Sequence, residues 1–395
     1  MVRAGAPIKQ LHLHDCKLLD GAKGLAAALS LLPGLQHLSI SIGFRVMDAL
    51  STDVLLGLLH LTRLDLWCAV KAGIGQPGPA LQPLQSLTRL VDLRLSLTHT
   101  AAIHRSMVTG MHHLSRLHLA VYAEPKPGAL ATLTQLQHLS LALVGNLVRT
   151  ATWATQLLSE LPQLQQLTHL GLRKSVDIID SNVPVAAFTA LTASSKLQHL
   201  DISWCRLPAG VWQRVFPAGR QLPHLQALNV SWVIETSGRP ATAPEGTRLV
   251  SCCSGLRSLD MQHMHYSTEL LAPLKRLSGL RTLLLEAVAS THGLEVVGQL
   301  TGLQNLHLND LHSAQGVLLP LTQLRQLTNL SYTGRRVGMP LALVHRFDKV
   351  SWVLEFIYHQ SKGGAVLQLD STMMDFGLII TGYVIYVNSF GLTLI

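Results

Sequence analysis

Histidines are the first residues of this chain whose type and spacing could support chemistry. The chain contains twenty of them. Seven stand beside leucines in a recurring way, either directly before a leucine or between two leucines: His37, His138, His169, His199, His12, His118 and His307. Imidazoles are common zinc ligands, but a zinc site needs three or four of them converging tetrahedrally at about 2.0–2.1 Å.

Histidines that repeat on neighbouring strands do not converge in that way. Side chains at one register position of adjacent strands point in parallel, roughly 5 Å apart. The chain also has no Cys-x-x-Cys and no His-Glu-x-x-His motif. We therefore expect a polar surface here, and no metal. A pH-sensitive binding surface is the sharper alternative, because histidines titrate near neutral pH.

Other catalytic constellations are missing from the sequence. It has no Gly-x-Ser-x-Gly, no Walker loop and no kinase signature. The adjacent pair Cys252 and Cys253 is expected to be a turn-side, partly buried pair, because sequence neighbours rarely form a disulfide without strain. Asp177 and Asp180 are expected to be solvated loop charges. We predict that the protein is not an enzyme and uses no cofactor.

Composition narrows the class of protein. Hydrophobic residues make up 48% of the 395 residues, aromatics 5% and charged residues 13%. A chain that is rich in leucine and poor in aromatics suits a repeat array, in which one aliphatic layer recurs. Five irregularly spaced cysteines argue against a disulfide framework, and residues 1–7 have no apolar core. These features favour a reducing, intracellular compartment.

The net charge is +9, but no run of Lys and Arg exceeds two residues. Diffuse positive charge is weak support for a nucleic-acid partner. Nucleic-acid binding is therefore disfavoured, and its affinity would fall steeply with salt.

A leucine motif recurs along the chain in a single register. The first copy reads Ile8-x-x-Leu11-x-Leu13-x-x-Cys16-x-Leu18, which matches the pattern L-x-x-L-x-L-x-x-N/C-x-L. The copies begin at Ile8, Leu35, Leu61, Leu90, Leu114, Leu136, Leu167, Leu197, Leu225, Leu256, Leu280, Leu303 and Leu327. Their mean spacing is about 27 residues, so the chain is an array of thirteen repeats.

This motif predicts the local structure of each repeat. Two leucines separated by one residue face the same side of a short strand. The remaining residues of each repeat return the chain through a turn and a helix, as in segments 24–29 and 153–158. Stacked repeats share one core, and thirteen parallel strands at about 4.8 Å give a sheet roughly 60 Å long.

The segment from Leu197 to Leu207, LQHLDISWCRL, is the best copy of the motif. On this motif the chain resembles leucine-rich-repeat proteins, particularly the cysteine-containing and ribonuclease-inhibitor-like intracellular groups. The resemblance covers about residues 8–335. It implies an α/β horseshoe-shaped solenoid, with a concave parallel β-sheet and helices or turns on the convex side. It also implies a role in protein interaction and carries no catalytic residues.

One departure from the family concerns the N/C position of the motif. In the family this position normally stacks side chains that satisfy buried backbone groups, but here only Cys16 and Cys205 fit. Buried loop backbone in the other copies needs other partners. The sequence therefore predicts an irregular or moderately stable array.

The concave face is the best candidate for a binding surface. The repeat register places on it Arg63, Asp65, Trp67, Arg94, Arg116, His118, Arg173, Asp201, Trp204, Asn229, Trp232 and Asp260. Trp204 and Trp232 occupy the same position in adjacent repeats. Trp and Arg are enriched at binding hot spots. The alternative is that a neighbouring loop covers both rings, or that they pack at the edge of the sheet.

The repeat pattern stops after Arg336, and residues 341–360, which mix aromatic and charged side chains, are expected to cap the open end of the core. We expect a leucine-rich-repeat domain at 1–340 and a cap with an apolar tail at 341–395. Residues 376–395 contain no charged side chain over a length that could cross a bilayer. Terminal strands or cap packing is the favoured interpretation, because the tail holds three glycines and several polar residues. A membrane tail anchor and a gene-model error are the alternatives.

Taken together, the sequence predicts a monomeric, non-catalytic scaffold that binds a protein partner of unknown identity. A cytoplasmic location is expected, with a cytoskeletal or axonemal (ciliary) role preferred by analogy. A tail-anchored membrane adaptor is the main alternative. A substrate-recognition arm of a larger assembly such as a ubiquitin ligase is another.

Overall fold

A computed structural model gives the fold of the chain. It describes residues 8–14, 21–41, 57–68, 84, 86–97, 111–121, 128–143, 151–174, 183–265, 267–286, 291–312, 318–335, 376–380, 383–388 and 391–394. The chain divides into two compact units. The first comprises Met1–Ala241 and Ser251–Gly255, and the second comprises Thr242–Val250 and Leu256–Ile395.

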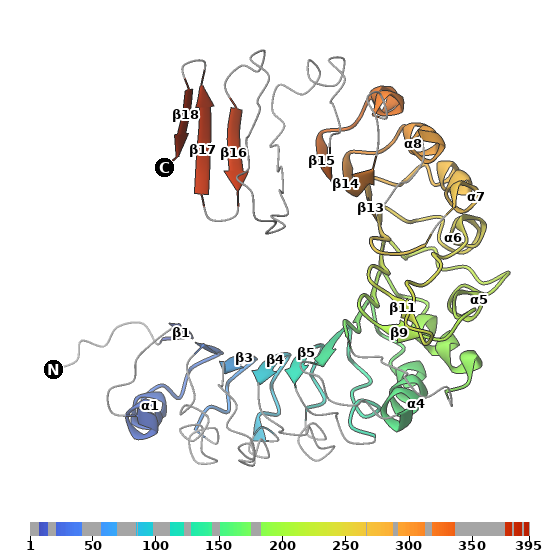
Figure 1. The fold of residues 1–395 in the computed structure, drawn as a ribbon. Coiled ribbons are helices and arrows are strands. Elements are labelled where there is room, and N and C mark those ends of the chain that lie inside the picture. Colours follow the sequence, from blue (N-terminus) through green and yellow to red (C-terminus); the bar gives the residue numbers. More distant parts are fainter. Residues whose placement is uncertain are drawn as a thin grey trace. The chain divides into compact units, whose positions relative to one another are not determined.

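The first unit holds nine parallel strands that follow one another in sequence order (Figure 1). They are β1 (Gln10–His14), β2 (His37–Ser41), β3 (Arg63–Cys68), β4 (Asp92–Leu97), β5 (Arg116–Val121), β6 (His138–Leu143), β7 (His169–Gly171), β8 (His199–Asp201) and β10 (Ala227–Asn229). Equivalent motif positions pair across neighbouring strands; for example, Leu64 pairs with Leu93, and Leu170 pairs with Leu200. Beyond the strand ends, β9 (Arg206–Leu207) and β11 (Ile234–Glu235) form a second, two-stranded parallel pair.

The leucine columns form the core of this unit. The two motif leucines of β3, Leu64 and Leu66, are 0% and 2% exposed, and those of β5, Leu117 and Leu119, are 2% and 0% exposed. The residue between each pair faces the opposite side, as the two-residue period of a strand requires. Burial of these repeated side chains is the main stabilising contribution to the array.

Helices and turns lie on one face of the strands of the first unit, and Figure 1 shows α1 and α4 there. The helices are α1 (Gly21–Ser30), α4 (Ala151–Glu160) and α5 (Trp212–Val215), with the 3₁₀ helices η2 (Leu161–Gln163) and η3 (Val185–Thr192). Helix α6 (Gly246–Cys252) lies where the chain passes between the units. The two segments expected to be helical, 24–29 and 153–158, fall within α1 and α4.

Backbone groups of the loops find partners without a side-chain ladder. Before most strands, the first motif leucine donates its N–H to the carbonyl three residues earlier, as Leu61 does to Leu58. After β7 and β8 the chain continues to bond the next repeat, with Leu172 N–H donating to Asp201 and Ile202 N–H to Asn229. These backbone bonds, together with the Cys205 thiol, which donates to the Leu172 carbonyl, satisfy loop groups within residues 171–174 and 201–235.

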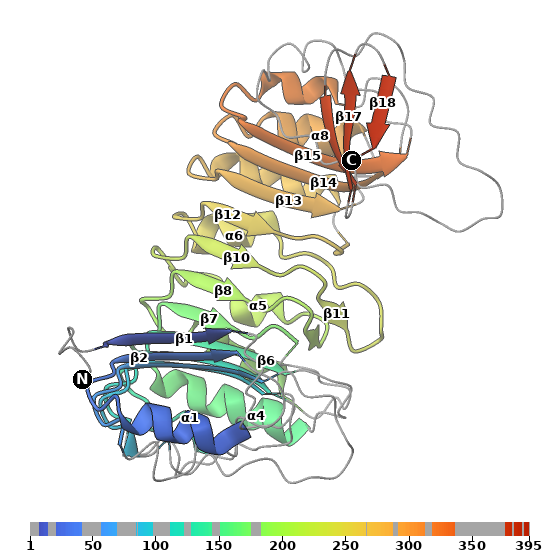
Figure 2. The same ribbon diagram turned by 90° about the vertical axis from the view of Figure 1, so that its left-hand side faces the viewer.

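The second unit repeats this architecture with four parallel strands. They are β12 (Ser258–Asp260), β13 (Thr282–Glu286), β14 (Asn305–His312) and β15 (Asn329–Arg335). Its helices are α7 (Thr268–Leu271), η4 (Ala272–Arg276), α8 (Thr291–Gly298) and η5 (Leu319–Gln323). Figure 2 shows these strands side by side, with α8 behind them. The two units together contain the thirteen predicted strands and confirm the α/β leucine-rich-repeat solenoid.

Near the C-terminus, three antiparallel strands occupy most of the uncharged tail. They are β16 (Phe376–Ile380), β17 (Tyr383–Asn388) and β18 (Gly391–Leu394). The expected cap over residues 341–360 lies outside the described residues, and the domain boundary at 340 stays a prediction. Among the described helices, none combines the length and apolarity needed to span a bilayer.

Candidate protein-binding face

The surface opposite the helices of the first unit is the candidate site, and we call it the open face. It is formed by the outward-facing residues of β3 to β10 and of the turns that follow these strands: Arg63, Asp65, Trp67, Asp92, Arg94, Arg116, His118, Arg173, Lys174, Asp201, Trp204, Asn229 and Trp232. Of the twelve residues predicted for the concave face, eight lie on these strands and three, Arg173, Trp204 and Trp232, lie in the turns that follow them; binding at these residues stays a prediction. The twelfth, Asp260, lies in the second unit at the corresponding position of β12.

Two tryptophans stack on each other at one part of the open face. The rings of Trp204 and Trp232 are parallel within 3°, with centroids 4.4 Å apart. The Lys174 ammonium lies 4.9 Å from the centroid of the Trp204 ring, within cation–π range. Trp204 remains 38% exposed despite these neighbours. The pair therefore presents a preformed apolar surface with a positive charge beside it.

A left-handed turn places these rings. Lys174, Trp204 and Trp232 stand at the same position of three consecutive repeats and have φ values of 55°, 62° and 58°. Non-glycine residues in this region of backbone space cost of order 1 kcal/mol or more, and bulky ones are rare there. The two tryptophans lie beyond the strand ends, so the expectation that they belong to the strand face itself needs this correction.

Asp and Asn side chains at the ends of the strands build this turn. Asp201 accepts a hydrogen bond from the Ser203 N–H at 2.9 Å, and Asn229 accepts one from the Ser231 N–H at 3.0 Å. In the second unit, Asp260 does the same for the Gln262 N–H at 3.1 Å. Such contacts two residues along the chain are Asx turns. These three predicted binding residues therefore have a structural role that the repeat register did not reveal.

Three arginines surround one buried carboxylate at another part of the open face. Asp92 is 2% exposed, and its carboxylate lies 3.7 Å from Arg63 Nε, 3.3 Å from Arg94 Nε and 3.3 Å from Arg116 Nε. Arg94 also donates from Nη2 to the second oxygen, so this pair is bidentate. Strand register explains the arrangement, because Arg63, Asp92 and Arg116 are paired across β3, β4 and β5.

The remaining predicted residues are distributed along the same face. Trp67, at the end of β3, is 49% exposed and pairs in register with Ser41 and Ser96. It is therefore not part of the Trp204–Trp232 stack. His118 and Arg173 are exposed. Asp65 is half-buried and pairs in register with Arg94.

Three histidines between the arginines and the tryptophans stack ring on ring. The centroids of His138 and His169 are 4.0 Å apart, as are those of His169 and His199. Desolvation by burial lowers the pKa of all three, and the neighbouring imidazoles lower that of His169 further, to about 4. The rings are therefore neutral at pH 7. The planes of neighbouring rings differ by 20° and 10°, so the three imidazoles do not converge on one point.

This stack predicts acid-sensitive stability. The folded pKa of His169, about 4, lies below its ordinary value of 6.5. The unfolded chain therefore takes up protons first as pH falls, and stability is lost between about pH 6.5 and pH 4. We expect His169→Gln to remove on the order of 1–2 kcal/mol of this loss, a figure already reduced for solvent exposure.

Urea denaturation at several pH values measures this contribution. The control is His113→Gln, which changes an exposed ring outside the stack and should leave the pH slope as it is in the wild type. Identical slopes for the wild type and His169→Gln would show that the stack does not couple to folding.

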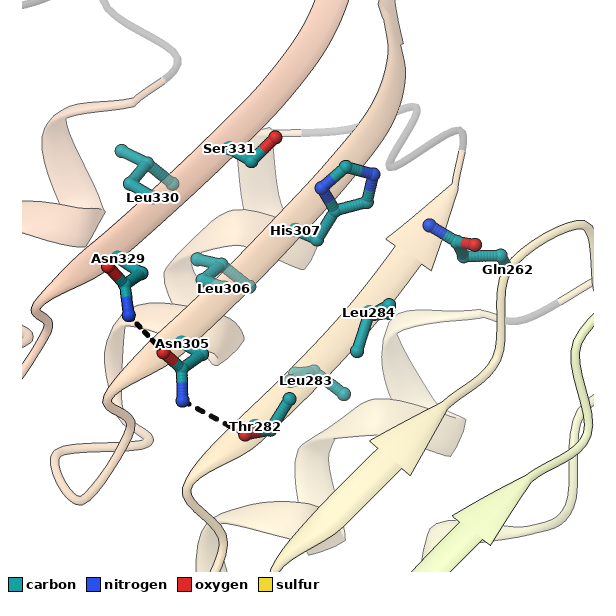
Figure 3. Close-up of a pocket in the computed structure, with 10 residues that line it drawn as sticks. All are labelled: Gln262, Thr282, Leu283, Leu284, Asn305, Leu306, His307, Asn329, Leu330 and Ser331. Carbon is teal, nitrogen blue, oxygen red and sulfur yellow. Dashed lines mark hydrogen bonds between the residues drawn. The ribbon is translucent and has the colours of Figure 1, made fainter. Parts of the chain in front are cut away.

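A hollow of about 380 Å³ lies on the second unit, and sequence reasoning missed it. Figure 3 shows its lining, which includes the side chains of Thr282, Asn305 and Asn329 from three neighbouring strands. The Asn305 amide donates to Thr282 Oγ1 at 3.1 Å, and the Asn329 amide donates to Asn305 Oδ1. These two hydrogen bonds link three neighbouring strands through uncharged side chains, an arrangement that supports the strands.

Cysteine chemistry is not favoured at the residues that the structure describes. Cys205, Cys252 and Cys253 are buried and form no disulfide. The adjacent pair is therefore more deeply buried than the partial burial that the sequence predicts. Burial raises the pKa of the Cys253 thiol to about 12, so the reactive thiolate does not form near neutral pH. Within the described part of the chain, no three His, Cys, Asp or Glu side chains are arranged to hold a metal ion.

Comparison with known proteins supports the fold. No family model matches the chain, and no curated protein matches its sequence. Among solved structures, a leucine-rich-repeat protein of Leptospira interrogans is 18% identical with a TM-score of 0.50, over 88% of this chain and 86% of that one. An internalin of Listeria monocytogenes is 20% identical with a TM-score of 0.48, over 76% and 81%.

A TLR13–ssRNA13 complex also matches, at 15% identity and a TM-score of 0.46, over 82% of this chain and 46% of that one. The Leptospira protein, whose TM-score is 0.50, is a leucine-rich-repeat protein, which agrees with the fold described above. At such identities the likeness concerns the fold alone.

Proposed function

We propose that the protein is a non-catalytic scaffold that binds a partner protein through the open face of its first unit. The observation that carries this proposal is the partly exposed Trp204–Trp232 stack. Leucine-rich-repeat folds generally serve as binding scaffolds.

Backbone strain at both tryptophans supports a binding role. The left-handed turn would be least strained with glycine, yet it carries two large indoles in adjacent repeats. Strain of this kind is often retained at functional sites. Stacking and the Lys174 contact fix the rings in advance, so a partner would lose little side-chain entropy in meeting them.

Truncation of the stack tests the proposal. Full-length wild type and the double variant Trp204→Ala/Trp232→Ala are used for affinity capture from native cell extract, with captured proteins quantified by mass spectrometry. We expect at least one partner to fall by roughly tenfold or more, because buried tryptophans are frequent hot spots.

Two controls make the result specific. Leu319→Ala removes a large apolar side chain that is 54% exposed in η5 of the second unit, and it should leave capture unchanged. Circular dichroism of the double variant should match the wild type. Full retention of every partner by a folded double variant would overturn the proposal.

The proposal extends to the subtype of the repeat and to the cellular location of the protein. Cys205 supports a cysteine-containing, ribonuclease-inhibitor-like subtype, because its thiol lies at the N/C position and donates to the Leu172 carbonyl at 3.0 Å. The thiols of Cys205, Cys252 and Cys253, none of which is in a disulfide, support a reducing, cytoplasmic location. A cytoskeletal or axonemal setting, a ubiquitin-ligase arm and a tail anchor at residues 376–395 rest on analogy or composition alone.

A further inference from the structure

We propose that the cluster of Arg63, Arg94 and Arg116, oriented by Asp92, binds an acidic segment of the partner protein. This inference deepens the proposed function and rests on it. The cluster lies on the open face of the first unit, on strands β3, β4 and β5.

One carboxylate, that of Asp92, lies within ion-pair distance of all three guanidinium groups. A guanidinium group has five N–H donors in a planar fork. The Asp92 carboxylate accepts hydrogen bonds from Nε and Nη2 of Arg94 and lies within ion-pair distance of Nε of Arg63 and Arg116, and its side chain is only 3% exposed. The carboxylate therefore fixes the fork of Arg94, attracts those of Arg63 and Arg116 by charge, and leaves most of their donors to other acceptors.

The three guanidinium groups are accessible to solvent and carry an excess of positive charge. The side chains of Arg63, Arg94 and Arg116 are 41%, 43% and 51% exposed, so their outer edges reach solvent. Three positive charges against one buried negative charge leave an excess of positive charge at the surface, and the half-buried Asp65 reduces it in part. Carboxylates of a partner fit such preoriented forks in bidentate geometry.

A path along the open face connects the arginine cluster with the tryptophan stack. Between the two sites the outward positions are occupied by the small residues Ser140 and Gly171 and by the neutral histidine stack. From β4 to β8 the distance along the sheet is about 20 Å, which an extended segment of about six residues spans. Lys174 adds positive charge beside Trp204. The geometry thus fits an extended segment with an acidic run and an apolar anchor.

A fluorescein-labelled oligoglutamate peptide tests the proposal directly. Its binding to the full chain is followed by fluorescence anisotropy at about 150 mM salt, where diffuse attraction is screened. We expect Arg116→Gln to weaken binding about threefold to tenfold. The matched control, Arg276→Gln, changes an exposed arginine in η4 and should bind as the wild type does. Equal losses in both variants, or no binding by the wild type, would overturn the proposal.

Two further comparisons separate orientation from net charge and peptide from nucleic acid. Asp92→Asn makes the protein more positive but removes the group that orients the arginines, so we expect binding no tighter than in the wild type. Tighter binding by this variant would contradict the orienting role. Tighter binding of an oligouridylate of equal charge would identify the cluster as a nucleic-acid surface instead.

The peptide assay tests the arginine cluster and the capture assay tests the tryptophan stack, so either proposal can be contradicted without the other. Oligoglutamate binding does not require the tryptophans, so Trp204→Ala/Trp232→Ala should retain it. If the peptide does not bind but partner capture still depends on the tryptophans, the arginine inference is wrong and the proposed function stands.

Discussion

Replacing Glu160 with alanine should lower the free energy of unfolding by about 3 kcal/mol. Glu160 ends α4, is 5% exposed, and accepts hydrogen bonds from three backbone N–H groups of the preceding repeat. Its carboxylate lies 2.7 Å from Gly128 N, 2.9 Å from Leu130 N and 3.1 Å from Ala131 N. Alanine leaves these donors without their acceptor, and each unsatisfied buried group costs about 1–3 kcal/mol.

Urea denaturation followed by circular dichroism measures this loss. Glu160→Gln keeps one acceptor oxygen and should fall between the wild type and the alanine variant. Gln163→Ala, an exposed change in the adjoining η2, should alter stability by less than about 0.5 kcal/mol. A Glu160→Ala protein as stable as Gln163→Ala would show that the carboxylate does not hold the neighbouring turn.

Replacing Phe188 with alanine should cost about 3–5 kcal/mol. Phe188 lies in η3, is 0% exposed, and is one of the two largest fully buried side chains among the described residues. The loss combines the transfer energy of the ring with the cavity that remains. Because a repeat contacts mainly its neighbours, the destabilisation should be local.

Hydrogen exchange with mass spectrometry shows where this loss falls. Amides of η3 and the adjoining α4 and α5, which pack against it, should lose protection first, while β2 and β3 keep theirs. Thr189→Ala, the exposed neighbour in the same helix, is the control and should leave the exchange pattern close to the wild type. Uniform loss of protection along the whole first unit would contradict local unfolding.

The fold was predictable because the leucine period determines which face of each strand is buried. Leu64, Leu117 and Leu170 lie in the core in the register that the motif predicts. The same period placed Arg63, Arg116 and the other outward residues on one face. Each strand pairs only with the strands of the neighbouring repeats, so the strand order follows directly from the order of the repeats.

The details of the site depended on contacts that the period does not encode. The sequence predicts Asp201 and Asn229 to be surface binding residues. In the structure they accept hydrogen bonds from backbone N–H groups two residues later and stabilise the turns that carry Trp204 and Trp232. An Asp or Asn at the same motif position in consecutive repeats was the available signal. Asp92 is another case, because its burial arises from arginines on both neighbouring strands. Glu160 gave no signal, since its partners lie about thirty residues earlier.

Site-specific photo-crosslinking tests the central claim most directly, namely that the partner binds the open face. Benzoylphenylalanine is placed at Arg173, which is exposed on the open face, or at Thr189, which is exposed in η3 on the helical side. We predict that irradiation in native extract gives a partner adduct from position 173, that this adduct disappears in the Trp204→Ala/Trp232→Ala background, and that position 189 gives none. An adduct from position 189 that survives loss of both tryptophans, with none from position 173, would contradict the account.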